Sequence, residues 1–327
     1  MNKMRRREFM LLMGSVFVDA LSAAYGQQSA KPPVVGFLAA GTPASHGAWV
    51  AAFAQRLSEL GWIDGRNITI EYRWAAGDNR QTTEFAAEFV RQKVDVIVTS
   101  AFGVLAAKEA TSTIPIVSAA YGDAVANGII KSLARPSGNV TGLTVQPAEL
   151  SSKRLELLRD IIPNVRRVAA LVNSHVVAAQ EVAAIRTASA KLNIDANVID
   201  IQTVEDIEAA MATLPGRTDA LYVYSEPLTN ANKDKIIKAA NAAKIPTIFG
   251  FREFVAAGGL ISYGPSFTDL FARAAEFTDK ILRGAKPADL PVQQPVKFDL
   301  IINLKAAEAL GLRISETVLT RADEVIE

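Results

Sequence analysis

The chain of 327 residues contains no cysteine and only two histidines, His46 and His175. The lack of cysteine excludes disulfide bonds, thiolate metal sites, a cysteine nucleophile and the lipid-modified N-terminal cysteine of bacterial lipoproteins. Neither histidine belongs to a spaced set of ligands, so we expect no metal centre. Aromatic residues make up only 7% of the chain, and 35 basic against 34 acidic residues leave a net charge of +1. This balance offers no basic surface for a phosphate backbone, which argues against a nucleic-acid partner.

Catalytic and cofactor motifs are also missing. The sequence has no Gly-x-Gly-x-x-Gly, Gly-x-x-x-x-Gly-Lys, Gly-x-Ser-x-Gly or His-Glu-x-x-His. These motifs mark dinucleotide binding, phosphate loops, serine hydrolases and zinc peptidases. We therefore expect no cofactor and no enzymatic activity.

The first 26 residues read as an export signal. Lys3 and Arg5 to Arg7 form a basic start, a mostly apolar run covers 9–24, and small residues follow at Ala24 and Gly26. The apolar run is too short for a membrane-spanning helix and is interrupted by Asp19. Arg6-Arg7-Glu8-Phe9-Met10 resembles a twin-arginine motif, although ordinary secretion signals also carry arginine clusters. We expect a soluble, exported, periplasmic product, with the route left open.

The rest of the chain alternates short β-branched runs with segments of helical period. That alternation predicts an α/β fold built from βα units on parallel sheets. The predicted strands are 34–39, 68–72, 94–99, 114–119, 168–172, 196–201, 220–223, 247–249, 260–262 and 296–303. The predicted helices are 48–60, 81–92, 103–110, one that includes 129–133, 149–161, 178–192, 204–214, 232–243, 267–282 and 304–310. The Pro- and Gly-rich segment 134–142 is predicted to be a turn-rich connector between two halves.

The two halves share a sequence phrase. Asp95 opens an apolar run that is followed by Pro115, and Asp219 opens one that is followed by Pro246. Each pair suits a strand, a crossover helix and a second strand, so we expect two similar doubly wound lobes. The tail is expected to cross between them more than once and form a hinge. We assign 33–142 and 264–290 to lobe 1, and 143–263 and 291–327 to lobe 2.

Ligands of such sheets sit beyond the carboxyl ends of the strands, and these ends can be located in the sequence. Candidate ligand-binding residues there are Gly41, Thr42, Ser100, Phe102, Tyr121 and Asp123 in lobe 1, with Asn173, Ser174, Glu226 and Arg252 in lobe 2. Hydroxyls and free N–H groups at helix starts suit a ligand carboxylate. The alternative for Thr42, Ser100 and Asn173 is helix capping.

The remaining candidates differ in chemistry. Phe102 and Tyr121 offer flat apolar contact to a ligand, or they pack on neighbouring loops. Asp123 and Glu226 suit an ammonium group and Arg252 a carboxylate, unless they form ion pairs or remain solvated. Both histidines are interpreted as polar loop residues.

Five longer phrases resemble the substrate-binding proteins of ABC transporters, in the tryptophan/tyrosine-type periplasmic family. They are 59–68 (ELGWIDGRNI), 132–142 (SLARPSGNVTG), 257–264 (AGGLISYG), 279–291 (DKILRGAKPADLP) and 321–327 (RADEVIE). The resemblance covers about residues 33–327 and implies a type I periplasmic binding fold that closes on a small ligand. The chain departs from the family pattern at four places near the expected ligand. The family's usual Gly-Thr-Pro is replaced by AFG at 101–103, its Asp-Pro-Val by DAV at 123–125, its Asn-Pro by NS at 173–174, and its Asp by Glu at 226.

The resemblance therefore favours an exported, monomeric solute-binding protein that delivers a small molecule to an ABC permease. An aromatic or branched amino acid, or an aromatic carboxylic acid, is the expected ligand, on the strength of Phe102, Tyr121 and Arg252. One alternative is a periplasmic sensor that docks on a receptor kinase. Another is an exported hydrolase or isomerase that uses Glu226 with His175.

Overall fold

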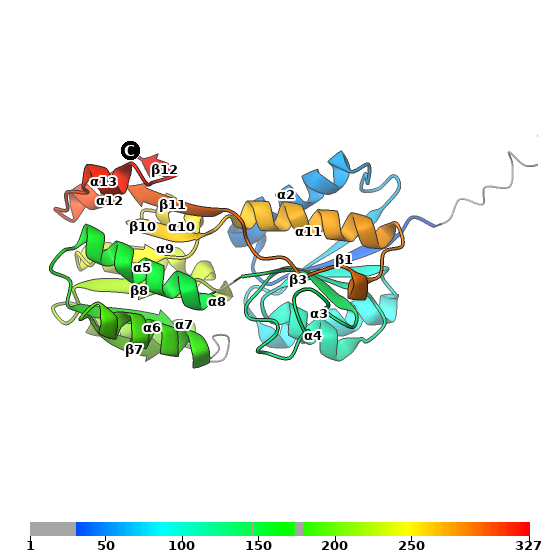
Figure 1. Cartoon of the computed structure of the whole chain (residues 1–327), viewed down its shortest axis with the longest axis horizontal. Helices are drawn as coiled ribbons and strands as arrows, with labels where there is room; N and C mark the ends of the chain where they lie inside the picture. Colours follow the sequence, from blue (N-terminus) through cyan, green and yellow to red (C-terminus); the bar gives the residue numbers. More distant parts are fainter. Residues whose placement is uncertain (1–30, 146, 174–178) are drawn as a thin grey trace, which may run out of the picture.

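The computed structural model describes residues 31–145, 147–173 and 179–327. The predicted export signal, residues 1–26, lies outside the described residues, as does His175. The described chain forms two lobes, each built on its own β-sheet with helices packed against it (Figure 1). This confirms the predicted α/β class with two lobes of largely parallel sheet.

Lobe 1 contains a five-stranded parallel sheet in the order β2-β1-β3-β4-β5. Its inner strands are almost continuously apolar, as expected for strands covered on both faces. The strands are β1 (Val34–Ala39), β2 (Thr69–Trp74), β3 (Val96–Ser100), β4 (Ile116–Tyr121) and β5 (Val140–Thr144). The helices that accompany this sheet are α2 (Pro43–Glu59), α3 (Asn79–Gln92), α4 (Phe102–Ala110), α11 (Phe267–Leu282) and the short 3₁₀ turn η1 (Pro287–Asp289).

Lobe 2 contains a seven-stranded sheet in the order β12-β11-β10-β9-β8-β6-β7, parallel except where β11 meets β10. The strands are β6 (Arg167–Val172), β7 (Asp195–Asp200), β8 (Ala220–Val223), β9 (Thr247–Phe249), β10 (Ile261–Pro265), β11 (Phe298–Asn303) and β12 (Glu324–Ile326). The helices are α5 (Pro147–Ile161), α6 (Ala179–Lys191), α7 (Val204–Thr213), α8 (Pro227–Ala231), α9 (Lys233–Ala242), α10 (Arg252–Ala256), α12 (Leu304–Ala309) and α13 (Glu316–Leu319).

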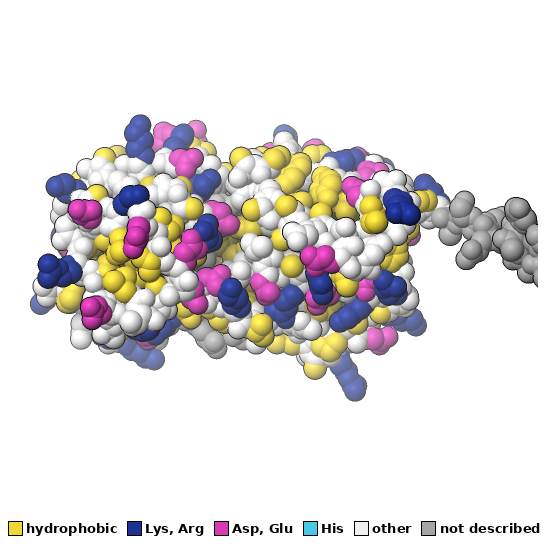
Figure 2. Space-filling model, turned by 90° about the horizontal axis from the view of Figure 1, so that it is seen from above, with side chains coloured by type: hydrophobic (Ala, Val, Ile, Leu, Met, Phe, Trp, Pro, Cys, Tyr) yellow, Lys and Arg dark blue, Asp and Glu magenta, His cyan; other side chains and the backbone are white. Residues whose placement is uncertain are grey.

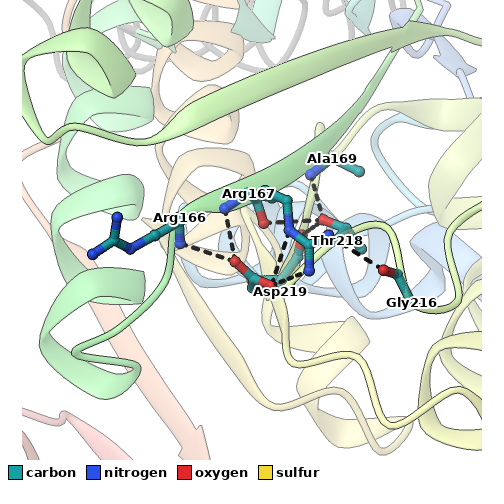
Figure 3. Close-up of polar contacts among 7 residues, drawn as sticks. Arg166, Arg167, Ala169, Gly216, Thr218 and Asp219 are labelled. Atoms are coloured by element: carbon teal, nitrogen blue, oxygen red, sulfur yellow. Dashed lines mark hydrogen bonds and ion pairs between the residues drawn. The ribbon is translucent and has the colours of Figure 1, made fainter.

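The first five strands of each lobe are arranged alike. The order β2-β1-β3-β4-β5 in lobe 1 corresponds to β7-β6-β8-β9-β10 in lobe 2. The shared sequence phrase has matching contacts: the Asp95 carboxylate accepts the Val34 N–H at 2.7 Å, and the Asp219 carboxylate accepts the Arg167 N–H at 2.8 Å. Figure 3 shows Asp219 holding the start of β6 in this way. The aspartate in each phrase therefore holds the first strand of its lobe in place.

The chain passes between the lobes three times, after β5, after β10 and before β11. Helix α11 follows β10 of lobe 2 but packs along α2 of lobe 1, and β11 then returns to lobe 2 (Figure 1). This is the predicted multi-crossing hinge. Few residues lie in each crossing, which is the geometry of domains that move as rigid bodies.

The connection between β4 and β5 differs from the prediction. Residues 122–139 form turns and bends, and the predicted helix around 129–133 is absent there. Asp123 fixes the first turn, because its carboxylate accepts the Ala126 N–H at 2.9 Å, and Gly128 has a positive φ of 67° that a helix would not allow. The predicted connector 134–142 in turn ends in strand β5, whose Gly142 has a φ of 119° beside a register shift in the β4–β5 ladder.

One hydrophobic cluster extends through both lobes. It joins Trp49 and Phe271 of lobe 1 to Phe251 and Phe254 of lobe 2. The surface is mixed in charge: basic and acidic side chains are interspersed over the face shown in Figure 2. Among the described residues, no helix is long and apolar enough to cross a membrane.

Candidate functional site

The predicted site residues follow the carboxyl ends of parallel strands in both lobes. Gly41 and Thr42 follow β1, Ser100 ends β3 and Tyr121 ends β4. The other described residues stand at equivalent places: Phe102 begins α4, Asp123 follows β4, Asn173 follows β6, Glu226 follows β8 and Arg252 begins α10. Ser174 lies outside the described residues.

The two lobes meet near these ends. The Asn230 Nδ2 of α8 donates to the Ser45 carbonyl of α2 at 3.4 Å, a contact between residues 185 positions apart. An ideal Cβ placed on Gly77 of lobe 1 would lie 3.8 Å from the carbonyl carbon of Pro227 in lobe 2. The structure therefore shows the lobes in contact.

Helix α4 begins without a side-chain cap. Its N-cap is Ala101, which makes no capping hydrogen bond and has φ 49° and ψ −132°. Within the described residues, no acceptor is found for the N–H groups of Phe102 and Gly103. Ser100, immediately before, is only 7% exposed, and its hydroxyl has no hydrogen bond to a described residue. The start of α4 thus presents unused donors beside a buried hydroxyl, at the strand end where ligands of such sheets bind.

Helix α2 of lobe 1 begins differently. Thr42 and Ser45 form a capping box, in which Thr42 Oγ1 accepts the Ser45 N–H at 3.2 Å and Ser45 Oγ accepts the Thr42 N–H at 3.0 Å. Ser45 Oγ also lies 2.9 Å from Nδ1 of His46. Gly41 is required here, because a Cβ at this position would lie 2.1 Å from His46 Nδ1. Thr42 therefore has the capping role that was its alternative, and Gly41 makes room for His46.

His46 lies within helix α2 and is buried, so its interpretation as a polar loop residue is wrong. It is 4% exposed and packs edge-on against Trp49 with ring centroids 4.4 Å apart. Burial, with the charge of Lys233 as a second cause, lowers the pKa of His46 to about 4. The imidazole is therefore neutral at pH 7.

Glu226 is buried at the carboxyl end of β8 and caps α8. Its Oε1 accepts the Thr229 N–H at 2.9 Å and its Oε2 the Leu228 N–H at 3.0 Å. Burial raises the pKa of Glu226 to about 7, although these two hydrogen bonds act in the opposite direction. The side chain is 4% exposed, so it is a carboxyl group with little water around it.

Phe102 and Tyr121 are both half-buried and pack against the same apolar cluster of lobe 1. Burial raises the pKa of Tyr121, and a hydrogen bond with Asn127 opposes this shift. The phenol is therefore neutral at physiological pH. Phe102 begins α4, just after β3, and Tyr121 ends the adjacent strand β4, so both rings lie at the same edge of the sheet as the uncapped α4 start.

Two charged candidates are engaged elsewhere. The Asp123 carboxylate accepts the backbone N–H groups of Val125 and Ala126, within an exposed turn. Arg252 pairs with Glu324 of the same lobe, and its Nε lies 2.9 Å from Glu324 Oε2. Of the sequence candidates, the structure thus brings Ser100, Phe102 and Tyr121 together in lobe 1.

Sequence reasoning did not identify the residues at the lobe junction. Trp49 donates its indole N–H to Glu253 Oε1 across the junction at 2.6 Å and stacks on Phe267, where α11 begins, at 4.7 Å between centroids. Its spacing from Val50 and Phe53 on α2 marks only a buried helix face. The sequence around Asn230 does not indicate that this residue contacts the other lobe, because no local pattern distinguishes such an asparagine.

A group of three or more histidine, aspartate or glutamate side chains suited to a metal ion is not found in the part of the chain that the structure describes. The buried acidic and imidazole groups of the site are Glu226 and His46.

Known proteins resemble this chain over most of its length. A family model described as "ABC transporter substrate binding protein" matches residues 43–326. The chain is 31% identical over 263 residues to a tyrosine-binding protein of Clostridioides difficile, which covers 80% of this chain and 76% of that protein.

Solved structures show the same fold. A domain from Streptococcus pneumonia in complex with L-Trp shares 24% identity and a TM-score of 0.84, covering 90% of this chain and 100% of that one. The ligand-free, open structure of a substrate-binding protein with adhesive properties from Clostridium difficile shares 27% identity and a TM-score of 0.66, covering 90% of this chain and 99% of that one.

The family match extends over nearly all described residues, and the tyrosine-binding relative is similar over most of its own length. The two lobes and the three crossings between them are the architecture expected of a protein that closes on a solute. The chain therefore belongs to the family of ABC transporter substrate-binding proteins, which are solute-binding proteins and not enzymes.

Proposed function

We propose that this protein captures an amino acid with an aromatic or branched side chain, or an aromatic carboxylic acid, between its lobes and delivers it to an ABC permease. The relatives named for tyrosine binding and for a complex with L-Trp support this ligand class. The observation that carries the proposal is the uncapped start of α4 beside the buried hydroxyl of Ser100.

The ligand carboxylate would bind at the start of α4. The N–H groups of Phe102 and Gly103 are donors without described acceptors, and Ser100 adds a hydroxyl. Hydrogen bonds to a charged group contribute about 1.5–3 kcal/mol each, which is more than neutral ones contribute. Gly103 also has to stay small, because a Cβ there would lie 2.0 Å from Thr99 Oγ1. These features make α4 the best anion site among the described helix starts of lobe 1.

The rest of the ligand would contact both lobes. Phe102 and Tyr121 supply apolar surface for a ring or a branched chain. From lobe 2, Asn173 and the buried carboxyl of Glu226 follow the carboxyl ends of β6 and β8, and a ligand ammonium beside Glu226 would favour its ionised form. Gly41 and Thr42 would line the site through their backbone, while Asp123 and Arg252 would need to leave their present partners in order to take part.

Closure follows from such two-sided contact. Interactions made by both lobes exist only in the closed form, so the ligand stabilises closure. A dissociation constant of ~1 μM corresponds to about −8 kcal/mol, which a few charge-assisted hydrogen bonds and one buried ring can supply.

We also propose that residues 1–26 direct export to the periplasm, where the mature chain acts as a monomer. The permease in the inner membrane would be its partner. The lobes would divide as 33–142 with 264–290 and 143–263 with 291–327, so that each boundary falls close to a crossing.

Isothermal titration calorimetry of the mature chain tests the proposal. The panel is L-tyrosine, L-tryptophan, L-leucine and aromatic carboxylic acids, and at least one is expected to bind near ~1 μM. Ser100→Ala is expected to weaken that ligand about tenfold or more, since a hydrogen bond to a charged group is lost. Ser58→Ala, an exposed serine on α2, is the matched control and should change nothing. Binding no tighter than ~1 mM across the panel would contradict the proposed ligand class.

A further inference from the structure

Asn230 stands at the junction of the lobes in an unfavourable environment. It is 0% exposed, on the short helix α8 of lobe 2. Its Nδ2 reaches the Ser45 carbonyl of lobe 1 at 3.4 Å, close to the longest distance for such a bond. Its Oδ1 has no hydrogen-bond partner and less than 1 Å² of exposed area. The side chain therefore has one weak bond and one buried acceptor with none.

Neither a water molecule nor a flip of the amide can give Asn230 Oδ1 a hydrogen-bond partner in this arrangement. An exposed area below 1 Å² leaves no room for a water molecule at Oδ1. Turning the amide over would place its oxygen against the Ser45 carbonyl oxygen, which is repulsive. The backbone of Asn230 is also held in place, because its N–H donates to the Glu226 carbonyl at 2.9 Å within the capped start of α8.

This cost exists only while the lobes are together. The hydrogen bond of the Asn230 side chain runs to the other lobe, so separation of α8 from the start of α2 breaks it and would let water reach the amide. The closed form alone has to desolvate the amide without full compensation. Closure by the other junction contacts, such as Trp49 with Glu253, is thereby opposed at a specific residue.

We propose that Asn230 sets the ligand affinity by opposing closure of the ligand-free protein. The amide keeps the empty lobes apart for most of the time, and the ligand supplies the free energy that closes them. The apparent affinity is the affinity of the closed form multiplied by the fraction of molecules that are closed beforehand, so any change that raises this fraction tightens binding. The inference rests on the proposed ligand-driven closure, but its first test needs no ligand.

Asn230→Leu is the decisive variant, because leucine has a similar size and no polar atoms. The chain has no cysteine, so Ala126→Cys and Gln202→Cys, both exposed and at strand ends of opposite lobes, can be labelled as a unique donor and acceptor pair. Single-molecule energy transfer without ligand is expected to show the ratio of closed to open molecules about tenfold higher in Asn230→Leu than in the parent, equivalent to ~1.4 kcal/mol. Asn230→Asp, which adds a charge, should lower the ratio.

Asn303→Leu is the matched control within the same lobe. Asn303 is a buried asparagine whose hydrogen bonds, to Val255 and Ala306, stay inside lobe 2. Its substitution should lower the melting temperature without moving the closed fraction. If Asn230→Leu fails to fold, Asn230→Ala removes the same polar atoms and is expected to shift the ratio in the same direction.

The ligand titration separates this inference from the proposed function. Where a panel compound binds the parent, Asn230→Leu should bind it up to about tenfold more tightly. A folded Asn230→Leu protein with an unchanged or smaller closed fraction overturns the role of Asn230, whatever the ligand is. If no panel compound binds the parent but the closed fraction rises in Asn230→Leu, the ligand class is wrong and the role of Asn230 stands.

Discussion

Ala101, between β3 and α4, lies in a backbone conformation that few residues other than glycine adopt. Its φ of 49° and ψ of −132° place the Cβ in a sterically costly position. A residue held in such a region costs about 1–3 kcal/mol. Ala101 lies at the strand end where we place the ligand carboxylate, so the strain is located at the proposed site.

We predict that Ala101→Gly stabilises the protein. Glycine removes the steric cost but adds about 0.5–1 kcal/mol of backbone entropy in the unfolded chain. The expected net gain is about 1 kcal/mol, which raises the melting temperature by about 2–4 °C for a domain of this size. Differential scanning calorimetry or urea unfolding followed by circular dichroism measures the effect.

Ala106→Gly is the control, because Ala106 lies inside α4 in ordinary helical geometry. Glycine there should lower stability by about 1 kcal/mol or more. The two substitutions are chemically identical and are expected to have opposite signs. A loss of stability in Ala101→Gly as large as that in Ala106→Gly would refute the assignment of strain to Ala101.

Three further predictions follow from the contacts. Burial raises the pKa of Glu226 from its usual 4.5 to about 7, because the buried site favours the neutral carboxyl group. The contribution of this group to the free energy of unfolding is therefore full below pH 4.5 and is lost as the pH rises through 7. Relative to Glu226→Gln, the parent should therefore lose about 3 kcal/mol of unfolding free energy between these pH values in urea titrations, and parallel curves would contradict the buried carboxyl. In chemical unfolding, Asp219→Asn should lower the free energy of unfolding by about 1–2 kcal/mol, and Asp95→Asn should lower it less. The reason is that Asp219 accepts two backbone N–H groups and pairs with an arginine, whereas Asp95 accepts one N–H. Equal losses would argue against these contacts at the strand starts. Trp49→Phe keeps the ring contacts but removes the bond to Glu253, so the closed fraction in the energy-transfer assay should fall, and an unchanged fraction would show that this bond does not hold the lobes together.

Much of the fold could be predicted because local patterns determine it. Strand β1 and helix α11 have the predicted bounds, since a continuous apolar run and a regular helical stripe need no distant information. The repeated Asp-to-Pro phrase correctly indicated two lobes of the same topology, because each aspartate carries out the same contact with a neighbouring strand.

Other features depend on contacts that no local pattern reveals. The segment before β5 contains helix-forming residues at 129–133, but the turn held by Asp123 and the positive φ of Gly128 prevent a helix. The short elements α8 and α10 were not predicted, because helices of this length have too few residues to show a period.

The candidate site could be located only in part for the same reason. The rule for strand ends places Ser100, Phe102 and Tyr121 at one edge of the lobe 1 sheet, as the structure has them, and their role in binding stays a prediction. It cannot show that Glu226 is consumed as a cap, that Arg252 pairs with Glu324, or that Asn230 faces the other lobe. The pairing of Arg252 and the position of Asn230 depend on contacts between segments far apart in the sequence, whereas the Glu226 cap is a local contact with Leu228 and Thr229.

A crystal structure of the mature protein with a bound panel compound tests the central claim most directly. The ligand is expected between the lobes, with its carboxylate within hydrogen-bonding distance of Ser100 Oγ and of the N–H groups that begin α4. A ligand bound outside the junction, or one whose carboxylate contacts neither Ser100 nor the start of α4, would contradict the account.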